Sequence, residues 1–193
     1  SSVDVCSSCA ISLHTSLNMA SCVMRISLLL GCFLPLAHTQ STIPSTMRAV
    51  VTTGTAAEGD FSNVKLVTHQ PVPEPGWGQV LIKVAASSVN PVDYKLLTSL
   101  GGPKVLGFDL SGTVVKIGWG FSSRLSVGDK VWADLGESGL LHLPIQLGAW
   151  AEYAVADESQ VSLMPTTLDF PSAAVLPLVS LTDYQTYKKA GSP

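Results

Sequence analysis

Two polar side chains, Asn90 and Tyr94, stand at the start of a short predicted helix. The Asn90 amide offers a donor and an acceptor, so it could hold the polar group of a ligand or substrate. The Tyr94 phenol could donate from the same helix face, because residues four apart lie one turn from each other. Simpler interpretations stay open: Asn90 caps the helix that Pro91 begins, and Tyr94 is a half-buried ring with its hydroxyl at the surface.

Three charged residues near this pair could also take part. Asp109 could face a cleft, or it could be a turn residue that satisfies nearby backbone amides. Asp93 and Lys95 are expected to form solvated or structural ion pairs.

Histidine and cysteine usage argues against a catalytic metal. All four cysteines lie before Met47, and the rest of the chain has two histidines, His69 and His142. A catalytic zinc needs about three protein ligands. We therefore predict no metal site, although Asp134 or Glu137 could supply a carboxylate ligand. His142 could be a catalytic acid or an ordinary loop residue.

Short strands with turn signals must position these residues. The patterns of apolar residues, glycines and prolines predict strands over 48–53, 64–68, 80–89, 110–117, 130–133, 150–156 and 160–163. Helices are predicted over 92–98 and from an Asp169 N-cap to Lys189, with a break or kink at Pro177. The fold class is therefore mainly β with short helices, in a barrel or sandwich.

The first 46 residues differ in composition from the rest. Positions 24–37 resemble a signal peptide, with one arginine followed by an apolar run too short for a membrane span, which needs about 20 residues. Equally, residues 1–46 could be upstream sequence before a true start at Met47. The first alternative predicts a secretory or organellar protein, and the second a cytoplasmic one.

Bulk composition excludes some partners. The chain has 193 residues, with a net charge of −3 and 13% charged residues. It carries no basic field, so nucleic acid is not an expected partner. We predict no transmembrane segment.

Five segments together resemble a known enzyme family: residues 88–95, 107–114, 127–131, 148–153 and 173–177. Their types and order are similar to the zinc-independent quinone oxidoreductase (zeta-crystallin-like) branch of the medium-chain dehydrogenase/reductase superfamily. The resemblance covers about residues 47–191. It implies a GroES-like β-barrel catalytic domain at 47–168, and at 169–193 the start of a connecting helix towards a Rossmann domain that is missing from this chain.

The resemblance also implies a chemistry. The family reduces quinones or α,β-unsaturated carbonyls with NADPH, and it places an active-site asparagine at Asn90, a tyrosine at Tyr94 and a cofactor-binding threonine at Thr182. Zinc enzymes of the superfamily have cysteine near position 90 and histidine near position 108, where this chain has Asn90 and Phe108. The Thr182 hydroxyl could instead bond to its own helix backbone.

The expected function is thus that of a fragment of an NADPH-dependent reductase, whose substrate is a small quinone or enone. Because no phosphate-binding glycine loop is expected before residue 193, this chain alone should be inactive and should not bind NADPH. The full-length parent could be a homo-oligomer. The alternatives are a non-catalytic binding or structural protein on the same barrel, an enoyl reductase, and a zinc-type alcohol dehydrogenase relative.

Overall fold

The computed structural model describes residues 42–99, 101–120, 124–136 and 148–191. The chain divides into two units, Ser1–Thr42 and Ile43–Pro193. The fold described below is that of the second unit, which contains the candidate site residues.

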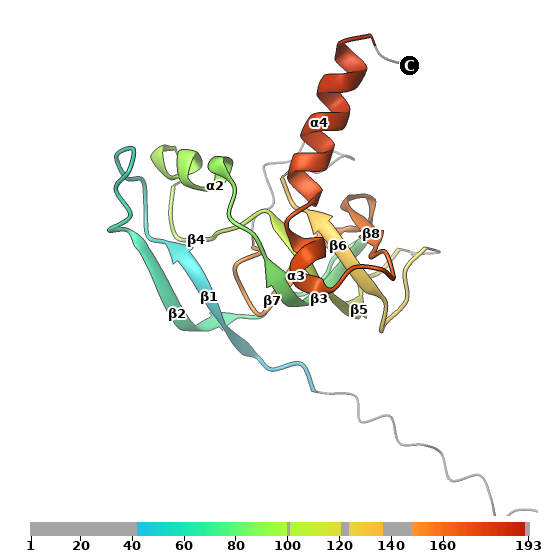
Figure 1. Ribbon diagram of the computed structural model, residues 1–193. Helices are drawn as coiled ribbons and strands as arrows, with labels where there is room; N and C mark the ends of the chain where they lie inside the picture. The colour runs from blue at the N-terminus through green and yellow to red at the C-terminus, as the bar shows by residue number, and fades with distance from the viewer. Residues whose placement is uncertain (1–41, 100, 121–123, 137–147, 192–193) are drawn as a thin grey trace, which may run out of the picture. The chain divides into compact units, whose positions relative to one another are not determined.

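Two antiparallel sheets form this unit (Figure 1). The larger sheet has the strand order β7-β3-β5-β6-β8, and the smaller one has the order β2-β1-β4. The strands of the larger sheet are β3 (Gln79–Ser87), β5 (Asp109–Ile117), β6 (Lys130–Asp134), β7 (Tyr153–Asp157) and β8 (Val161–Leu163). Those of the smaller sheet are β1 (Thr46–Thr52), β2 (Val64–Pro71) and β4 (Lys104–Val105).

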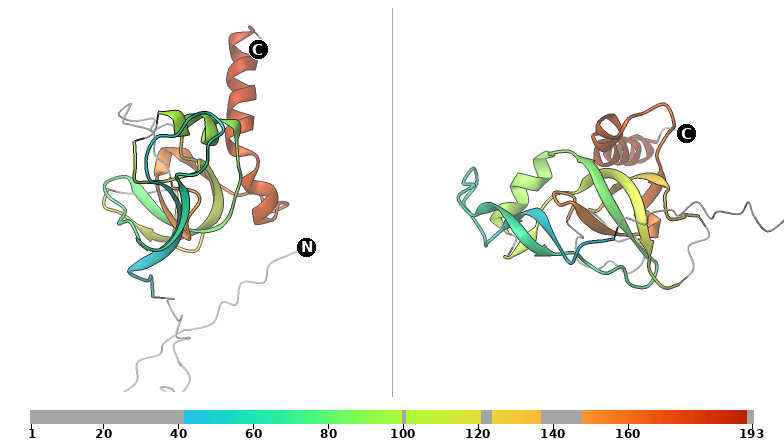
Figure 2. Two further views of the ribbon diagram at one scale, coloured as in Figure 1. Left: turned by 90° about the vertical axis from the view of Figure 1, so that its left-hand side faces the viewer. Right: turned by 90° about the horizontal axis from the view of Figure 1, so that it is seen from below.

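Backbone hydrogen bonds join the two sheets. Ala49 of β1 forms an isolated antiparallel bridge with Ala151, just before β7. Beside it, the N–H of Val50 donates to the carbonyl oxygen of Trp150 over 2.8 Å. Figure 2 (left) shows the strands curving round a common centre.

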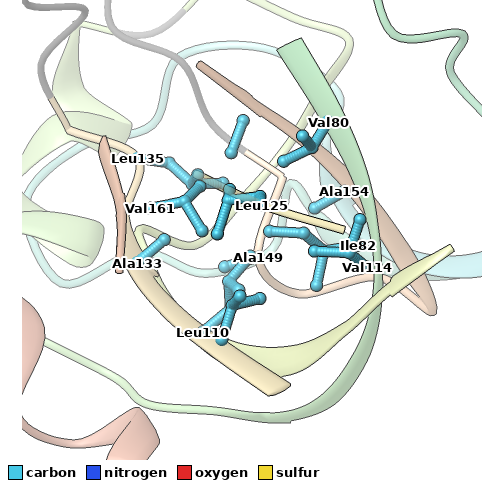
Figure 3. Close-up of a cluster of buried hydrophobic side chains, with 12 residues drawn as sticks. Val80, Ile82, Leu110, Val114, Leu125, Ala133, Leu135, Ala149, Ala154 and Val161 are labelled. Carbon is cyan, nitrogen blue, oxygen red and sulfur yellow. The ribbon is translucent and has the colours of Figure 1, made fainter. Parts of the chain in front are cut away.

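The main core lies inside the larger sheet (Figure 3). It is aliphatic, and its buried members include Val80, Ile82, Leu110, Val114, Val131, Ala133, Leu135 and Val161. Successive residues of a strand point to opposite faces. Leu110 of β5 and Ala133 of β6 therefore fill the core, whereas Asp109 and Asp134 point to the other face, towards the helices.

Two helices pack on that outer face, α3 (Phe170–Ala174) and α4 (Pro177–Lys189). The other helical elements are α2 (Pro91–Lys95) and the 3-10 turns η1 (Leu96–Thr98) and η2 (Glu158–Gln160). The predicted cap at Asp169 is confirmed, since its carboxylate accepts a bond from the N–H of Ser172 over 2.9 Å. Pro177 separates α3 from α4, as expected from its missing N–H.

The prediction of a mainly β fold with short helices is confirmed. Some boundaries differ. β2 runs to Pro71, which an edge strand tolerates because proline at its end needs no ladder donor. β7 begins only at Tyr153, because Trp150 and Ala151 pair with β1 instead. Among the described residues, no helix is both long and apolar enough to cross a membrane.

Candidate active site

Asn90 is the N-cap of α2, as one of the two interpretations predicted. Its φ of −112° and ψ of 157° are extended, and Pro91 takes the first helical position. The carboxylate of Asp93 accepts a bond from the N–H of Asn90 over 2.6 Å, closing the first turn. The prediction of an ion pair for Asp93 is wrong. Only 3% of this residue is exposed, and its carboxylate bonds to the backbone N–H of Asn90 instead.

An indole fixes the segment that leads into this cap. Nε1 of Trp150 donates to the carbonyl oxygen of Ser88 over 2.8 Å. The ring lies directly on Gly107, where an added Cβ would come 2.3 Å from Cδ1 of the indole. Gly107 also has a φ of +94°, which strains any residue with a side chain. Glycine at position 107 thus lets Trp150 reach and hold the backbone before Asn90.

Asp109 joins the elements around the cap. It is the first residue of β5 and is fully buried. Its Oδ2 accepts from Nδ2 of Asn90 over 2.9 Å and from Oγ of Ser88 over 3.2 Å. Its Oδ1 accepts from the N–H of Leu178, in the first turn of α4, over 3.0 Å. Asp109 does satisfy a backbone amide, as one interpretation held, but it does so from a strand and across a long sequence separation.

Burial disfavours ionisation of the Asp109 carboxyl group. Desolvation raises the pKa of Asp109 from 3.8 to about 6, and the charge of Asp134 adds to the rise. The hydrogen bonds from Asn90, Leu178 and Ser88 oppose it. Desolvation also raises the pKa of Asp93. The site therefore contains two buried carboxyl groups that hold their protons more tightly than exposed ones.

A pocket of about 800 Å³ opens beside these carboxyl groups. Apolar lining residues come from α2, η1, β6 and the residue before β5: Val92, Leu96, Phe108 and Trp132. From α4 come the neutral polar residues Ser180, Thr182 and Gln185 and the apolar residues Pro177, Leu178 and Leu181. Asp134 at the end of β6 contributes the one carboxylate among the described lining residues. Such a lining suits a flat, uncharged organic group.

The three predicted site residues, Asn90, Tyr94 and Thr182, differ in their position relative to the pocket. Thr182 lines the pocket, whereas Asn90 and Tyr94 are not among its described lining residues. Asn90 is 6% exposed and lies behind the pocket, linked to Leu178 through Asp109. Tyr94 is 39% exposed. It follows the lining residue Val92 by two positions, about 200° round a helix axis, so its ring points away from the pocket.

Sequence analysis offered a second interpretation of Thr182, in which its hydroxyl bonds to the backbone of its own helix. In the structure, the threonine of α4 that makes such a bond is Thr186. Oγ1 of Thr186 donates to the carbonyl oxygen of Thr182 over 2.8 Å. Thr182 itself is exposed on the helix. Its cofactor-binding role stays a prediction.

Sequence reasoning could not single out Trp132 among the four tryptophans, and it missed Asp134 as a pocket residue. The signal was present, because they alternate with the core residues Val131 and Ala133 along β6. Asp134 had been considered only as a metal ligand. Within the described ranges, no three His, Cys, Asp or Glu side chains converge as a metal site. His142 and Glu137 lie outside the described residues.

The raised pKa of Asp109 predicts a pH-dependent stability. The folded state binds this proton more tightly than the unfolded state, so the contribution is present at low pH and is lost as the pH rises from about 4 through about 6. A shift of about 2 pKa units corresponds to roughly 3 kcal/mol. We expect Asp109→Asn to gain stability relative to wild type over this range, measured as free energy of unfolding by urea at several pH values.

Glu58→Gln is the matched control, because Glu58 is an exposed carboxylate. Its difference from wild type should stay flat. An equally flat difference for Asp109→Asn would show that Asp109 is not the buried titrating group.

Comparison with known proteins identifies the family of this domain. Residues 76–166 match the family model of the alcohol dehydrogenase GroES-like domain. The 2-methylene-furan-3-one reductase of Solanum lycopersicum is 39% identical over 159 residues, which are 79% of this chain and 40% of that protein. The chloroplastic NADPH-dependent alkenal/one oxidoreductase of Arabidopsis thaliana is 39% identical over 144 residues, 72% of this chain and 36% of that protein.

The solved structures agree. The quinone oxidoreductase of Coxiella burnetii superposes with a TM-score of 0.62 at 32% identity, covering 75% of this chain and 45% of that one. The chain thus spans about two-fifths of the length of the curated relatives it matches. Motif order, barrel and relatives agree: the chain belongs to the medium-chain dehydrogenase/reductase superfamily, and it carries that superfamily's alcohol dehydrogenase GroES-like domain.

Proposed function

We propose that this chain is part of an NADPH-dependent reductase that transfers hydride to quinones or α,β-unsaturated carbonyls without zinc. Residues 47–168 would form its catalytic domain, and residues 169–193 would begin the connection to a dinucleotide-binding domain. The observation that carries the proposal is the pocket, whose described lining is apolar or neutral and polar apart from Asp134. Relatives named for alkenal, furanone and quinone reduction support the same substrate class.

The pocket walls suit a planar carbonyl compound. The rings of Phe108 and Trp132 offer flat apolar surfaces, and Val92 of α2 and Leu96 of η1 add aliphatic ones. Such a wall excludes water, which strengthens hydrogen bonds to a carbonyl oxygen as it gains negative charge. The hydroxyls of Ser180 and Thr182 on α4 can donate such bonds.

The polar lining residues of α4 also fit the nicotinamide end of NADPH. A carboxamide both donates and accepts hydrogen bonds, and the hydroxyl and amide groups of Thr182 and Gln185 can do the same. When bound, NADPH supplies the hydride. The protein's part is to orient the ring, keep water out and offer hydrogen bonds.

Asn90 and Tyr94 have different places in this proposal. Asn90 is held by Asp109 at the base of the site, so it supports the pocket from behind and fixes the start of α2. Tyr94 lies on the exposed side of α2, where its phenol could meet a ligand or a neighbouring domain in the full-length protein.

Zinc independence rests on the residue types at two positions. The side chain of Phe108 has no metal-binding atom and is 3% exposed against the pocket. The amide of Asn90 is engaged by Asp109 and Ser88. A quinone or enone is already electrophilic, so its reduction needs no Lewis acid, whereas alcohol oxidation requires an alkoxide to be stabilised.

The first test is a substrate panel for the full-length protein that contains this chain. We expect NADPH-dependent reduction of simple enones and quinones, measured as loss of absorbance at the nicotinamide band. A strong zinc chelator should leave the rate unchanged. Saturated alcohols with NADP⁺ should give no activity.

Two results would contradict the proposal. Chelator-sensitive alcohol oxidation would identify a zinc-type dehydrogenase. Absence of turnover and of NADPH binding would favour a non-catalytic binding protein on the same barrel.

Thr182→Val tests the cofactor role of the threonine. Valine keeps the shape but removes the hydroxyl, so loss of one hydrogen bond should raise the KM for NADPH about 3- to 10-fold, corresponding to roughly 0.5–1.5 kcal/mol. Thr186→Val is the matched control, since Thr186 is one turn further along α4 and is not a described lining residue. Equal KM values for both variants would remove Thr182 from the cofactor site.

Tyr94→Phe tests the phenol that the resemblance implies. If the hydroxyl bonds substrate in the full-length protein, kcat/KM should fall about 3- to 10-fold while the thermal midpoint stays unchanged, because the ring remains. Unchanged kcat/KM would leave Tyr94 as a surface aromatic residue of α2.

A further inference from the structure

The outer face of β6 carries an indole with an available donor group. Trp132 alternates with the core residues Val131 and Ala133, so its side chain lies on the face that lines the pocket. The indole of Trp150 is held by a hydrogen bond, whereas none of the hydrogen bonds among the described residues involves Nε1 of Trp132. Nor is this atom one of the described buried polar atoms that lack a partner. The N–H group of Trp132 is therefore accessible and can donate to a ligand.

Two serine hydroxyls lie on the same side of the pocket. Trp132 is the register partner of Ser162 on β8, the edge strand of the larger sheet, and register partners bring their Cβ atoms to about 5 Å. Ser159 of η2 lines the pocket as well. Both serines are exposed, and no hydrogen bond within the described ranges engages either hydroxyl. The β8 side of the pocket thus has three neutral hydrogen-bonding groups.

Helix α3 is attached on the other side of Trp132. There the register partner is Ser111 of β5, whose hydroxyl donates to the carbonyl oxygen of Phe170 in α3 over 2.6 Å. The helix is thus tied to the β5 side, while the exposed Ser162 lies on the opposite side of Trp132. The edge of the sheet is where a ligand can reach the indole.

The types of these groups define what could bind to them. An indole N–H only donates, so the ligand atom must be an acceptor, which excludes an ammonium group. The charge of Asp134, which raises the pKa of Asp109, lies two residues further along β6 on the same face and would repel an anionic acceptor. A neutral oxygen remains. A hydroxyl group fits best, because it can accept from the indole and donate to Oγ of Ser162.

These side chains lie at a distance from the α2 end of the pocket, which Val92 and Phe108 line. The N–H of Leu135 donates to the carbonyl oxygen of Phe108 over 3.0 Å. Trp132 precedes Leu135 by three residues, which is roughly 10 Å along a strand. A molecule that reaches both ends of the pocket must therefore be elongated.

We propose that Trp132, Ser162 and Ser159 form a specificity subsite for a neutral, oxygen-bearing substituent of the substrate. The inference rests on the proposed function and narrows its substrate class to enones or quinones whose side chain ends in a hydroxyl group. The reacting carbonyl group lies nearer to Phe108. The terminal hydroxyl group binds between the indole N–H and the serine hydroxyls.

The test uses the full-length protein, NADPH and two straight-chain vinyl ketones of equal length, one ending in a methyl group and the other in a hydroxyl group. Wild type should prefer the hydroxy ketone, measured as the ratio of the two kcat/KM values. Ser162→Ala should lower this ratio about 3- to 10-fold, the effect of one lost hydrogen bond. Trp132→Phe keeps an aromatic ring but removes the N–H, and it should lower the ratio by a similar factor.

Ser126→Ala is the matched control. Ser126 is an exposed serine in the loop before β6 and is not a described lining residue, so this variant should keep the wild-type ratio.

A binding measurement covers the case in which a variant fails to fold. In the NMR spectrum of the full-length protein with NADP⁺, the indole N–H signal of Trp132 should shift when the hydroxy ketone is added, and shift less with the methyl-terminated ketone. Comparison with Trp132→Phe or Trp132→Tyr identifies the signal.

The outcomes separate the two proposals. A wild-type protein that reduces no enone or quinone would overturn both. An active wild type with no preference for the hydroxy ketone, an unchanged ratio in Ser162→Ala, or an indole signal that does not respond would each overturn only the subsite. A raised KM for NADPH in Ser162→Ala with an unchanged ratio would also overturn it, by assigning these groups to hydroxyls of the cofactor.

Discussion

The buried carboxyl group of Asp109 is the interaction on which the site depends. It binds the amide of Asn90 at the start of α2, the hydroxyl of Ser88 before it and the first turn of α4. The start of α2 and the first turn of α4 are far apart in the sequence, and without Asp109 the N–H of Leu178 would lose the acceptor that the structure gives it. Leaving such a group unpaired costs about 1–3 kcal/mol. One carboxyl group therefore fixes the relative positions of two helices that line the same pocket.

The sheet makes this arrangement possible by keeping its two faces distinct. Along β5, Leu110 and Val114 fill the aliphatic core, while Asp109 and Ser111 face the helices. Ser111 donates from Oγ to the carbonyl oxygen of Phe170 over 2.6 Å, which ties α3 to the same face. Stability from the core and polar contacts at the site thus come from alternate residues of one strand.

The fold class and most elements could be predicted from the sequence, because strand alternation, turn glycines and the Asp169 cap are local signals. β4 could not, since two residues carry no periodicity. In the site, Asn90 was recognised as a cap, but its bond to Asp109 depends on strand register, which no local pattern encodes. The same holds for Asp134, because its position opposite Asp109 depends on the register of β5 and β6. Tyr94 was expected to share a face with Asn90, but the residues that line the pocket here are Val92 of α2 and Leu96 of η1.

The attachment of α4 has a mechanical consequence. Its 13 residues extend from Pro177 to Lys189, a length of about 20 Å, and its middle and end are exposed while its first turn bonds to Asp109. The helix is therefore anchored through its first turn, at Leu178. A rotation of α4 by about 10° about Leu178 would move Lys189, about 16 Å further along the helix, by roughly 3 Å. Such a rotation would carry the pocket-lining residues Thr182 and Gln185 with the helix, while the bond between Asp109 and Asn90 at the start of α2 stays in place.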